Sequence, residues 1–310
     1  MKRSVQLLIA FVVITVIGCG APDILYIPSP PQGIVVNCLT YNYHPFQAFL
    51  STSRGILEND PGGTIPIIQD ATVKLYENEI LVETFAHDTT WSTGGTRYYS
   101  ITSTPQPGKR YKLTADRPGL PTATAEYLQP DSVAILSVSV RKIGPNVTYP
   151  YLTDVQFRVQ FTDPPGEDFY ELDAIHITDS LSYSFPGDTT VYKDVRSDDP
   201  YFQVVDPAYA DDNDLVFSAI TFNDLFFDGK TATLDLVAQI DGGFSNKRTY
   251  LVYLRHTSKE YYKYIRSVYL QSTTSGDPFA QPVLLENNFT NGYGIFAGFT
   301  QTKMFARSQN

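Results

Sequence analysis

Cysteine is almost absent from the 310-residue chain, which contains only Cys19 and Cys38. Cys19 follows an N-terminal apolar run. If that run is a leader, one thiol stays in the folded part and no internal disulfide can form. Cys38 lies in the strand-like stretch IVVNCLT, where we expect a small buried side chain. The four histidines are scattered, with no two at metal-ligand spacing, which argues against a histidine-based zinc site.

Sequence signatures of common enzyme classes are also absent. The chain has no nucleophile elbow, no H-E-x-x-H motif and no P-loop. Gly292, Gly294 and Gly298 give G-x-G-x-x-x-G, which does not match the dinucleotide fingerprint. We therefore expect a protein that is not an enzyme. A hydrolase whose triad comes together from distant residues stays open as an alternative, because such groups are recognised by geometry.

Basic residues are too few to balance the acids, since Lys plus Arg number 23 against 33 Asp plus Glu. The formal charge is −10, and it becomes −12 if Lys2 and Arg3 are removed with a leader. A surface of this sign repels nucleic acid and anionic lipid headgroups. We therefore expect no nucleic-acid partner.

A long apolar run occurs only at the N-terminus, where VQLLIAFVVITVIG follows Lys2 and Arg3. This run is shorter than the roughly 20 residues that a spanning helix needs. It therefore predicts a cleaved signal peptide, residues 1–18. The residues VIG before Cys19 resemble the lipobox of bacterial lipoproteins, in which the cysteine carries the lipid. An ordinary secretory signal with an unrelated cysteine is the alternative.

The segment after the leader predicts a tether. Residues 19–32 contain four prolines, which prevent a helix and favour extended chain. Three acyl chains on Cys19 exceed what stable membrane anchoring requires. We expect a covalent lipid on Cys19 to hold the folded part at a membrane.

The rest of the chain predicts a mostly β fold of two antiparallel β-sandwich-like domains. Seven short strand-like runs within residues 33–129 predict an immunoglobulin-like β-sandwich. The pair Glu77-Asn78 divides two alternating halves and predicts a hairpin. Pro130 marks a boundary, and longer strand-like runs in 130–310 predict a larger β-sandwich.

One segment has helical periodicity. Tyr261, Tyr264, Ile265 and Val268 recur at i, i+3, i+4 and i+7, which predicts an amphipathic helix at about 258–272. The stretch NGYGIFAGF that follows predicts a terminal strand packed under this helix. There we expect the glycines to let a helix aromatic, such as Tyr264, lie flat on the strand.

An acidic stretch is the candidate for ion chemistry. Asp206, Asp211, Asp212 and Asp214 offer the hard oxygen ligands that Ca²⁺ takes, without EF-hand spacing. A solvated acidic loop is the alternative. Apart from the lipid on Cys19 and this calcium candidate, we expect no cofactor.

Aromatic loops are the candidates for ligand or partner contact. Trp91 lies in the polar loop HDTTWSTGGTRYY, and Tyr41 and Tyr43 lie in TYNYHPF. Such side chains are frequent anchors at binding surfaces. Packing of the same rings against their own domain is the alternative.

Several motifs together resemble one family. YYKYIRSVYLQ, GDPFAQPV and NGYGIFAGF resemble its C-terminal pattern, and FNDLFFDGKTATL resembles its central block. VVNCLTYNYHPFQAFLSTSR and ATVKLYEN fit its first domain. The family is a group of Bacteroidota outer-membrane lipoproteins catalogued as a domain of unknown function, number forty-two forty-nine.

The resemblance implies a place of action and no catalytic residues. Members are often encoded beside TonB-dependent receptors. We therefore expect an outer-membrane lipoprotein that is an accessory or ligand-binding partner of a TonB-dependent transporter. A structural subunit of an envelope or secretion assembly is the alternative. Asp23, the only acid close behind Cys19, favours the cell surface over the periplasmic face.

Overall fold

The computed structural model describes most of the chain after residue 30. The described residues are 31–54, 67–89, 96–177, 182–183, 192–193, 201–204, 215–216, 219–241, 249–274, 281 and 283–309. The predicted signal peptide, Cys19, Trp91 and the four aspartates between 206 and 214 lie outside them. Gln32–Ser53 and Gly62–Asn310 form one compact unit, to which all of the following refers.

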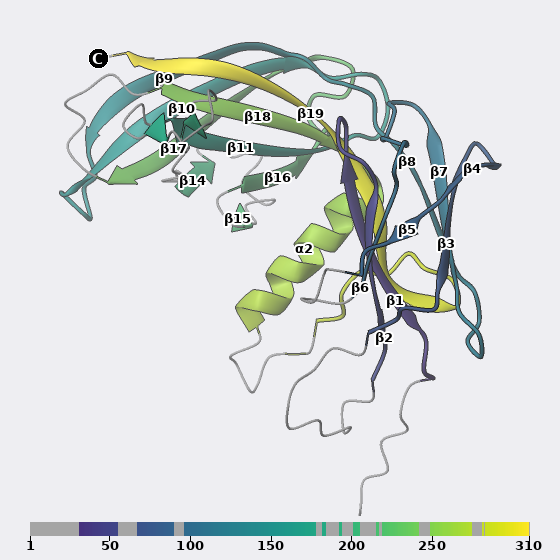
Figure 1. The fold of residues 1–310 in the computed structure, drawn as a ribbon. Coiled ribbons are helices and arrows are strands. Elements are labelled where there is room, and N and C mark those ends of the chain that lie inside the picture. Colours follow the sequence, from purple (N-terminus) through teal and green to yellow (C-terminus); the bar gives the residue numbers. More distant parts are fainter. Residues whose placement is uncertain are drawn as a thin grey trace, which may run out of the picture. The chain divides into compact units, whose positions relative to one another are not determined.

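The predicted fold class is confirmed, because the chain is mostly β with one helix near its C-terminus (Figure 1). The strands before residue 130 are β1 (Ile34–Tyr41), β2 (Gln47–Thr52), β3 (Thr72–Glu77), β4 (Ile80–Thr84), β5 (Ala86–His87), β6 (Thr96–Tyr99), β7 (Arg110–Asp116) and β8 (Ala123–Leu128). After it come β9 (Ile135–Pro145), β10 (Leu152–Thr162), β11 (Phe169–Ile177), β12 (Ser182–Tyr183), β13 (Tyr192–Lys193), β14 (Tyr201–Val204), β15 (Leu215–Val216), β16 (Ala219–Asn223), β17 (Thr231–Asp241), β18 (Thr249–Thr257), helix α2 (Lys259–Thr274) and β19 (Gly292–Gln309).

The N-terminal strands form two layers around one core. One sheet has the order β4-β3-β7-β8, and β1, β2, β6 and β5 belong to the larger sheet. Buried residues alternate along β1 and β7, as expected of strands with one apolar face. Cys38 is fully buried in this core, as predicted. The predicted hairpin joins β3 to β4 through Asn78 and Glu79, both at positive φ.

The C-terminal strands enclose a second core. The order β14-β17-β10-β9 continues into β19, while β18 pairs with β11, β11 with β16 and β16 with β15. Phe157, Phe161, Tyr170 and Tyr250 are fully buried between these strands. The side chains alternate in and out along β10, which is why the sequence pattern predicted strands here.

The last strand connects the two sets of strands. The first half of β19 pairs parallel to β1, from Ile34↔Gly292 to Tyr41↔Phe299. Its second half pairs antiparallel to β18, and its end pairs parallel to β9. Figure 1 shows this strand in yellow. The predicted boundary at residue 130 stays a prediction, but β19 contributes side chains to both cores, Phe296 to the first and Ala306 to the second.

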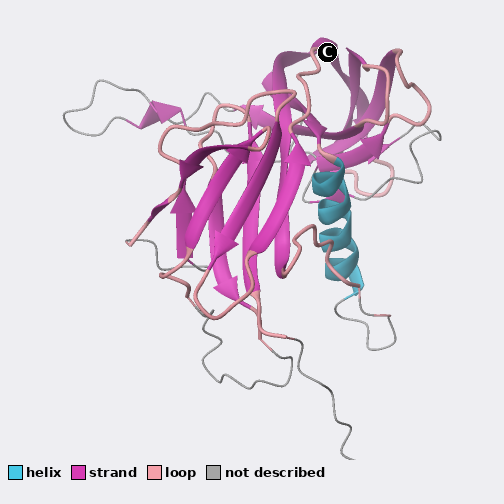
Figure 2. Cartoon of the chain, turned by 90° about the vertical axis from the view of Figure 1, so that its right-hand side faces the viewer, coloured by secondary structure: helices cyan, strands magenta, loops and turns pink. Residues whose placement is uncertain are grey.

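The predicted helix is present as α2, which lies beside the strands in Figure 2. Its first turn is capped by Ser258, whose Oγ accepts a hydrogen bond from the Tyr261 N–H at 3.2 Å. Tyr261 packs against Ile295 and Ala297 of β19. No helix among the described residues has the length and apolar character needed to span a membrane.

The expected role of the C-terminal glycines was wrong in one respect. Tyr261 and Tyr264 of α2 pack on the Ile295 and Ala297 face of β19, whereas Gly298 faces the opposite side. A Cβ on Gly298 would lie 2.9 Å from the Tyr127 hydroxyl of β8. Gly294 has φ +113°, and a Cβ there would overlap the backbone of Val36 in β1. The glycines therefore allow β1 and β8, not the helix, to approach β19 closely.

Candidate functional site

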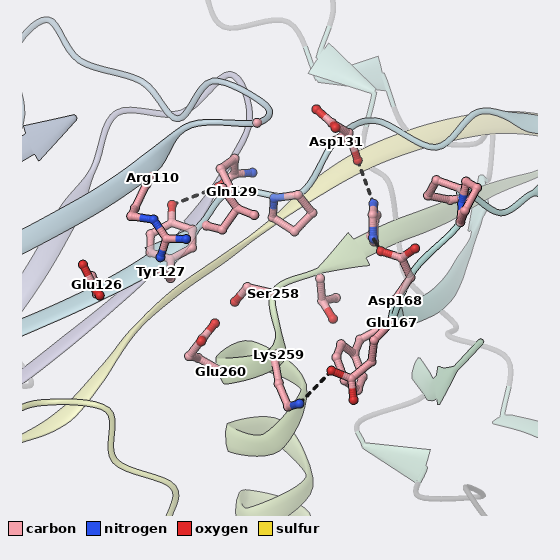
Figure 3. Close-up of a pocket in the computed structure, with 18 residues that line it drawn as sticks. Arg110, Glu126, Tyr127, Gln129, Asp131, Glu167, Asp168, Ser258, Lys259 and Glu260 are labelled. Atoms are coloured by element: carbon pink, nitrogen blue, oxygen red, sulfur yellow. Dashed lines mark hydrogen bonds and ion pairs between the residues drawn. The ribbon is translucent and has the colours of Figure 1, made fainter. Parts of the chain in front are cut away.

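A polar cavity of about 630 Å³ lies where the β8–β9 connection meets the start of α2. Strands β7 and β8, the loop before β11 and the end of β18 complete its wall (Figure 3). Acidic residues outnumber basic ones in the lining. The charged residues are Arg110, Glu126, Asp131, Glu167, Asp168, Lys259 and Glu260. Lys259, the one lysine in the lining, donates a hydrogen bond from Nζ to Glu167 Oε2 at 2.7 Å.

Buried polar side chains fix the wall on the side of the β8–β9 connection. Gln129 is fully buried and donates from Nε2 to the Phe299 carbonyl at 2.9 Å and to Thr300 Oγ1 at 2.8 Å. The Tyr127 hydroxyl donates to Gln129 Oε1 at 2.9 Å and lies 2.5 Å from Thr40 Oγ1. Burial raises the pKa of Tyr127 well above its usual value, so the phenol stays protonated. This network ties β1, β8 and β19 together.

His256 lies in the cavity wall with both ring nitrogens occupied. Nδ1 is 2.8 Å from the Asp131 carbonyl oxygen, and Nε2 is 2.7 Å from Asp168 Oδ1. Tyr170 stacks on the ring at a centroid distance of 5.0 Å. The Asp168–His256 pair therefore connects β18 to the β8–β9 connection and the loop before β11.

This histidine is poorly placed to act as a general base. A base must offer a free nitrogen within hydrogen-bond reach of the nucleophile. Neither nitrogen of His256 is free, and the hydroxyl of Ser258 caps helix α2. Among the described residues, His256 and Ser258 therefore do not form a nucleophile–base pair.

Three carboxylates meet beside the cavity. Asp163 follows β10, Asp168 precedes β11 and Asp224 follows β16. One oxygen of each lies within 4.8 Å of the other two. Burial, with a further contribution from neighbouring carboxylates, raises the pKa of Asp163 and of Asp224. Among the described residues, this is the group that could hold a metal ion.

The aromatic residues predicted to contact a ligand lie elsewhere. Tyr41 lines a smaller cavity of about 260 Å³ together with His44 and Tyr264, and it stacks on Phe299 at 5.4 Å. Tyr43 is 85% exposed and lines neither cavity. Trp91 and the predicted calcium ligands Asp206, Asp211, Asp212 and Asp214 lie outside the described residues.

Sequence patterns did not indicate the residues that the structure brings together. Asp163, Asp168 and Asp224 lie in the loops DPPGED and NDLFFDG, which read as ordinary polar turns. His256 carried no ligand pattern because its partners are 88 and 125 residues away in the chain. The signal that was available is the position of Asp163 and Asp224, each directly after a strand-like stretch.

The fold and cavity define a mostly β protein with a polar cavity lined by residues of both sets of strands and of the start of α2. Residues 22–304 match the family described as Domain of unknown function (DUF4249), and the chain belongs to this family. No curated protein matches. One solved structure, titled BspA_C_WT, has 7% sequence identity and a TM-score of 0.17, covering 73% of this chain and 95% of that chain. A similarity that weak carries no argument about this fold.

Proposed function

We propose that the protein is a lipid-anchored, non-enzymatic accessory or ligand-binding protein of the outer membrane. Its partner would be another outer-membrane protein, such as a TonB-dependent transporter. The observation that carries the binding role is the cavity of about 630 Å³ with a charged lining held by buried hydrogen bonds. Concave sites with a few convergent polar groups are the usual places for small ligands.

The lining favours a polar or cationic ligand. Glu126, Asp168 and Glu260 face the cavity, and Glu167 already holds Lys259. Arg110 offers a guanidinium that suits a carboxylate or hydroxyl group of the same ligand. An amino-acid or peptide-like ligand, which carries both signs of charge, fits this lining.

Binding is preferred to catalysis because the residues that resemble a catalytic pair have structural partners. His256 is held between Asp131 and Asp168, and Ser258 caps α2. Anchoring at Cys19 is proposed from the leader sequence, and the surface-facing side of the outer membrane from Asp23. The net negative charge of the chain suits a protein whose folded part is held away from anionic membrane surfaces.

Native purification of the full chain through a C-terminal tag tests this function. We expect a transporter-type β-barrel and a bound polar small molecule to copurify from outer membranes. Glu126→Gln/Glu260→Gln should lose the small molecule and keep the barrel. Glu79→Gln, an exposed carboxylate outside the cavity, is the matched control. A large assembly without ligand would instead support a structural subunit, and turnover by the purified chain would support a hydrolase.

A further inference from the structure

The carboxylates Asp163, Asp168 and Asp224 form a cluster built from two interlocked loops, in which Asp163 and Asp224 are buried and Asp168 is partly exposed. The Asp224 N–H donates to the Asp168 carbonyl at 3.2 Å, and the Asp163 N–H donates to the Lys230 carbonyl at 3.0 Å. Asp163 and Asp224 are 2% and 5% exposed. The backbone therefore fixes the three side chains together where solvent screens their charges weakly.

One buried oxygen of the cluster lacks a hydrogen-bond donor among the described residues. The Asp163 oxygens accept from the Tyr170 hydroxyl and from the Gly229 N–H, the latter at 2.8 Å. Asp168 Oδ1 contacts His256 Nε2 at 2.7 Å. Asp224 Oδ2 is buried and has no hydrogen-bond partner among the described residues. Buried carboxylate oxygens are normally paired, so this one indicates a ligand that the chain does not itself supply.

The charge count points to a cation. Three carboxylates carry up to three negative charges, and in the described part of the chain the imidazole of His256 is the one nitrogen-bearing side chain that contacts them. Carboxylate oxygens this close together repel one another where solvent screens weakly, and a bound cation would relieve that repulsion. A divalent cation would offset two of these charges.

We propose that Asp163, Asp168 and Asp224 bind one hard divalent cation of the Ca²⁺ class. An all-carboxylate oxygen set suits Ca²⁺, Mg²⁺ or Mn²⁺ and does not suit soft metals. Asp168 also lines the cavity, which gives the ion a path in and room for water ligands. His256 orients Asp168 from the second shell, as partners of metal ligands commonly do. The ion would join the loop after β10 to the loop after β16.

This site differs from the acidic stretch that the sequence predicted, and it does not depend on the proposed function. It adds a cation that would stiffen one wall of the cavity whether or not the cavity takes a small molecule. Loss of the ion and loss of a transporter partner are therefore separate results.

Calcium titration of the chelator-treated full chain in detergent tests the site, by calorimetry and by the melting temperature. The reference protein carries Asp206→Asn, Asp211→Asn, Asp212→Asn and Asp214→Asn, so that the acidic stretch contributes nothing. We expect this protein to bind one Ca²⁺ and to melt at a higher temperature as Ca²⁺ rises. Adding Asp224→Asn should weaken binding by more than about tenfold.

Asp228→Asn is the matched control, because it makes the same charge change in the same loop. Asp228 Oδ1 accepts from the Gly166 N–H at 2.9 Å, which an asparagine oxygen can also do, and it is not in the cluster. The control should bind Ca²⁺ like the reference. No response to millimolar Ca²⁺, Mg²⁺ or Mn²⁺, or equal losses in Asp224→Asn and Asp228→Asn, would overturn the site.

Terbium luminescence decides the question if Asp224→Asn fails to fold. Tb³⁺ replaces Ca²⁺ in oxygen sites, and the Tyr170 hydroxyl bonded to Asp163 places a sensitising ring beside the ion. We expect tyrosine-sensitised emission from the reference protein, displaced by Ca²⁺ and strongly reduced in Tyr170→Phe. Emission that Tyr170→Phe leaves unchanged would place the ion elsewhere and overturn the proposal.

Discussion

Gly298 of β19 lies directly against Tyr127 of β8, at a point where any side chain on residue 298 would overlap the phenol. A Cβ would be 2.9 Å from the Tyr127 hydroxyl and 2.8 Å from Gln129 Oε1. The absence of a side chain at one residue therefore lets a buried hydrogen-bond network form between three strands. That network supports the cavity wall, so the glycine contributes to the site without touching a ligand.

Gly298→Ala should destabilise the protein by about 1–3 kcal/mol, the usual cost of forcing extra volume into a packed site. Denaturant unfolding measures the loss. In a Thr40→Ala/Tyr127→Phe background, which removes two of the crowded oxygens, the same substitution should cost less. An unchanged stability in Gly298→Ala would show that the strands are not packed this closely.

Arg255→Met should destabilise the protein by about 3–5 kcal/mol, because it leaves buried carboxylates without their cation. The Arg255 guanidinium contacts Glu171 and lies 3.0 Å from Asp173 Oδ2, while Tyr261 of α2 donates to Glu171 at 3.1 Å. Hydrogen exchange should show the first turn of α2 losing protection. Arg158→Met breaks an exposed pair with Asp235 and should change stability little. Equal losses of stability in Arg255→Met and Arg158→Met would contradict the stabilising role of the Arg255 ion pairs.

Glu83 should give the protein an acid-sensitive contribution to stability. Burial raises the pKa of Glu83, but hydrogen bonds from Ser100, Ser103, the Ile101 N–H and Thr102 outweigh it and lower the value to about 2. A depressed folded-state pKa contributes stability above the unfolded value of about 4.3, and this is lost as pH falls toward 2.

Urea unfolding at neutral pH and at pH values between about 4.3 and about 2 tests this contribution to the free energy of unfolding. Glu83→Gln should be less stable than the wild type at neutral pH and should lose less stability on acidification. Glu79→Gln, whose carboxylate is 63% exposed, should follow the wild type. If the free energy of unfolding changes with pH in the same way in wild type and Glu83→Gln, Glu83 does not make this contribution to stability.

The cysteines should differ in reactivity. Cys38 is fully buried, and burial raises its pKa far above the ordinary thiol range, so the native protein should not react with a maleimide. Full-length protein purified from its native host should show one reactive thiol in denaturant, because the proposed acylation would block Cys19. Two reactive thiols per denatured chain would contradict the proposed lipid.

Local patterns predicted the parts of the fold that depend on neighbours in sequence. The spacing of Tyr261, Tyr264, Ile265 and Val268 predicted α2, and alternation around Asn78 predicted the β3–β4 hairpin. The parallel pairing of β1 with β19 joins residues more than 250 positions apart, and no local pattern encodes it. For the same reason, the glycines were assigned to the helix side of β19 instead of the β8 side.

The site was harder to predict than the fold. Asp163, Asp168 and Asp224 are ordinary turn residues until β10, β11 and β16 bring their ends together. His256 is separated in sequence from both of its partners. Site chemistry of this kind depends on strand order, which short-range periodicity does not determine. The aromatic loops could be recognised from the sequence, because their tyrosine and tryptophan residues are a local feature that does not depend on strand order.

The central claim is that the chain works from a membrane through a lipid on Cys19. Membrane fractionation and detergent partitioning of full-length wild type and Cys19→Ser, expressed in the native host, test it most directly. We expect the wild type to stay with the outer membrane and to enter the detergent phase, and Cys19→Ser to be released into the aqueous phase. A Cys19→Ser protein that remains with the outer membrane as the wild type does would contradict it.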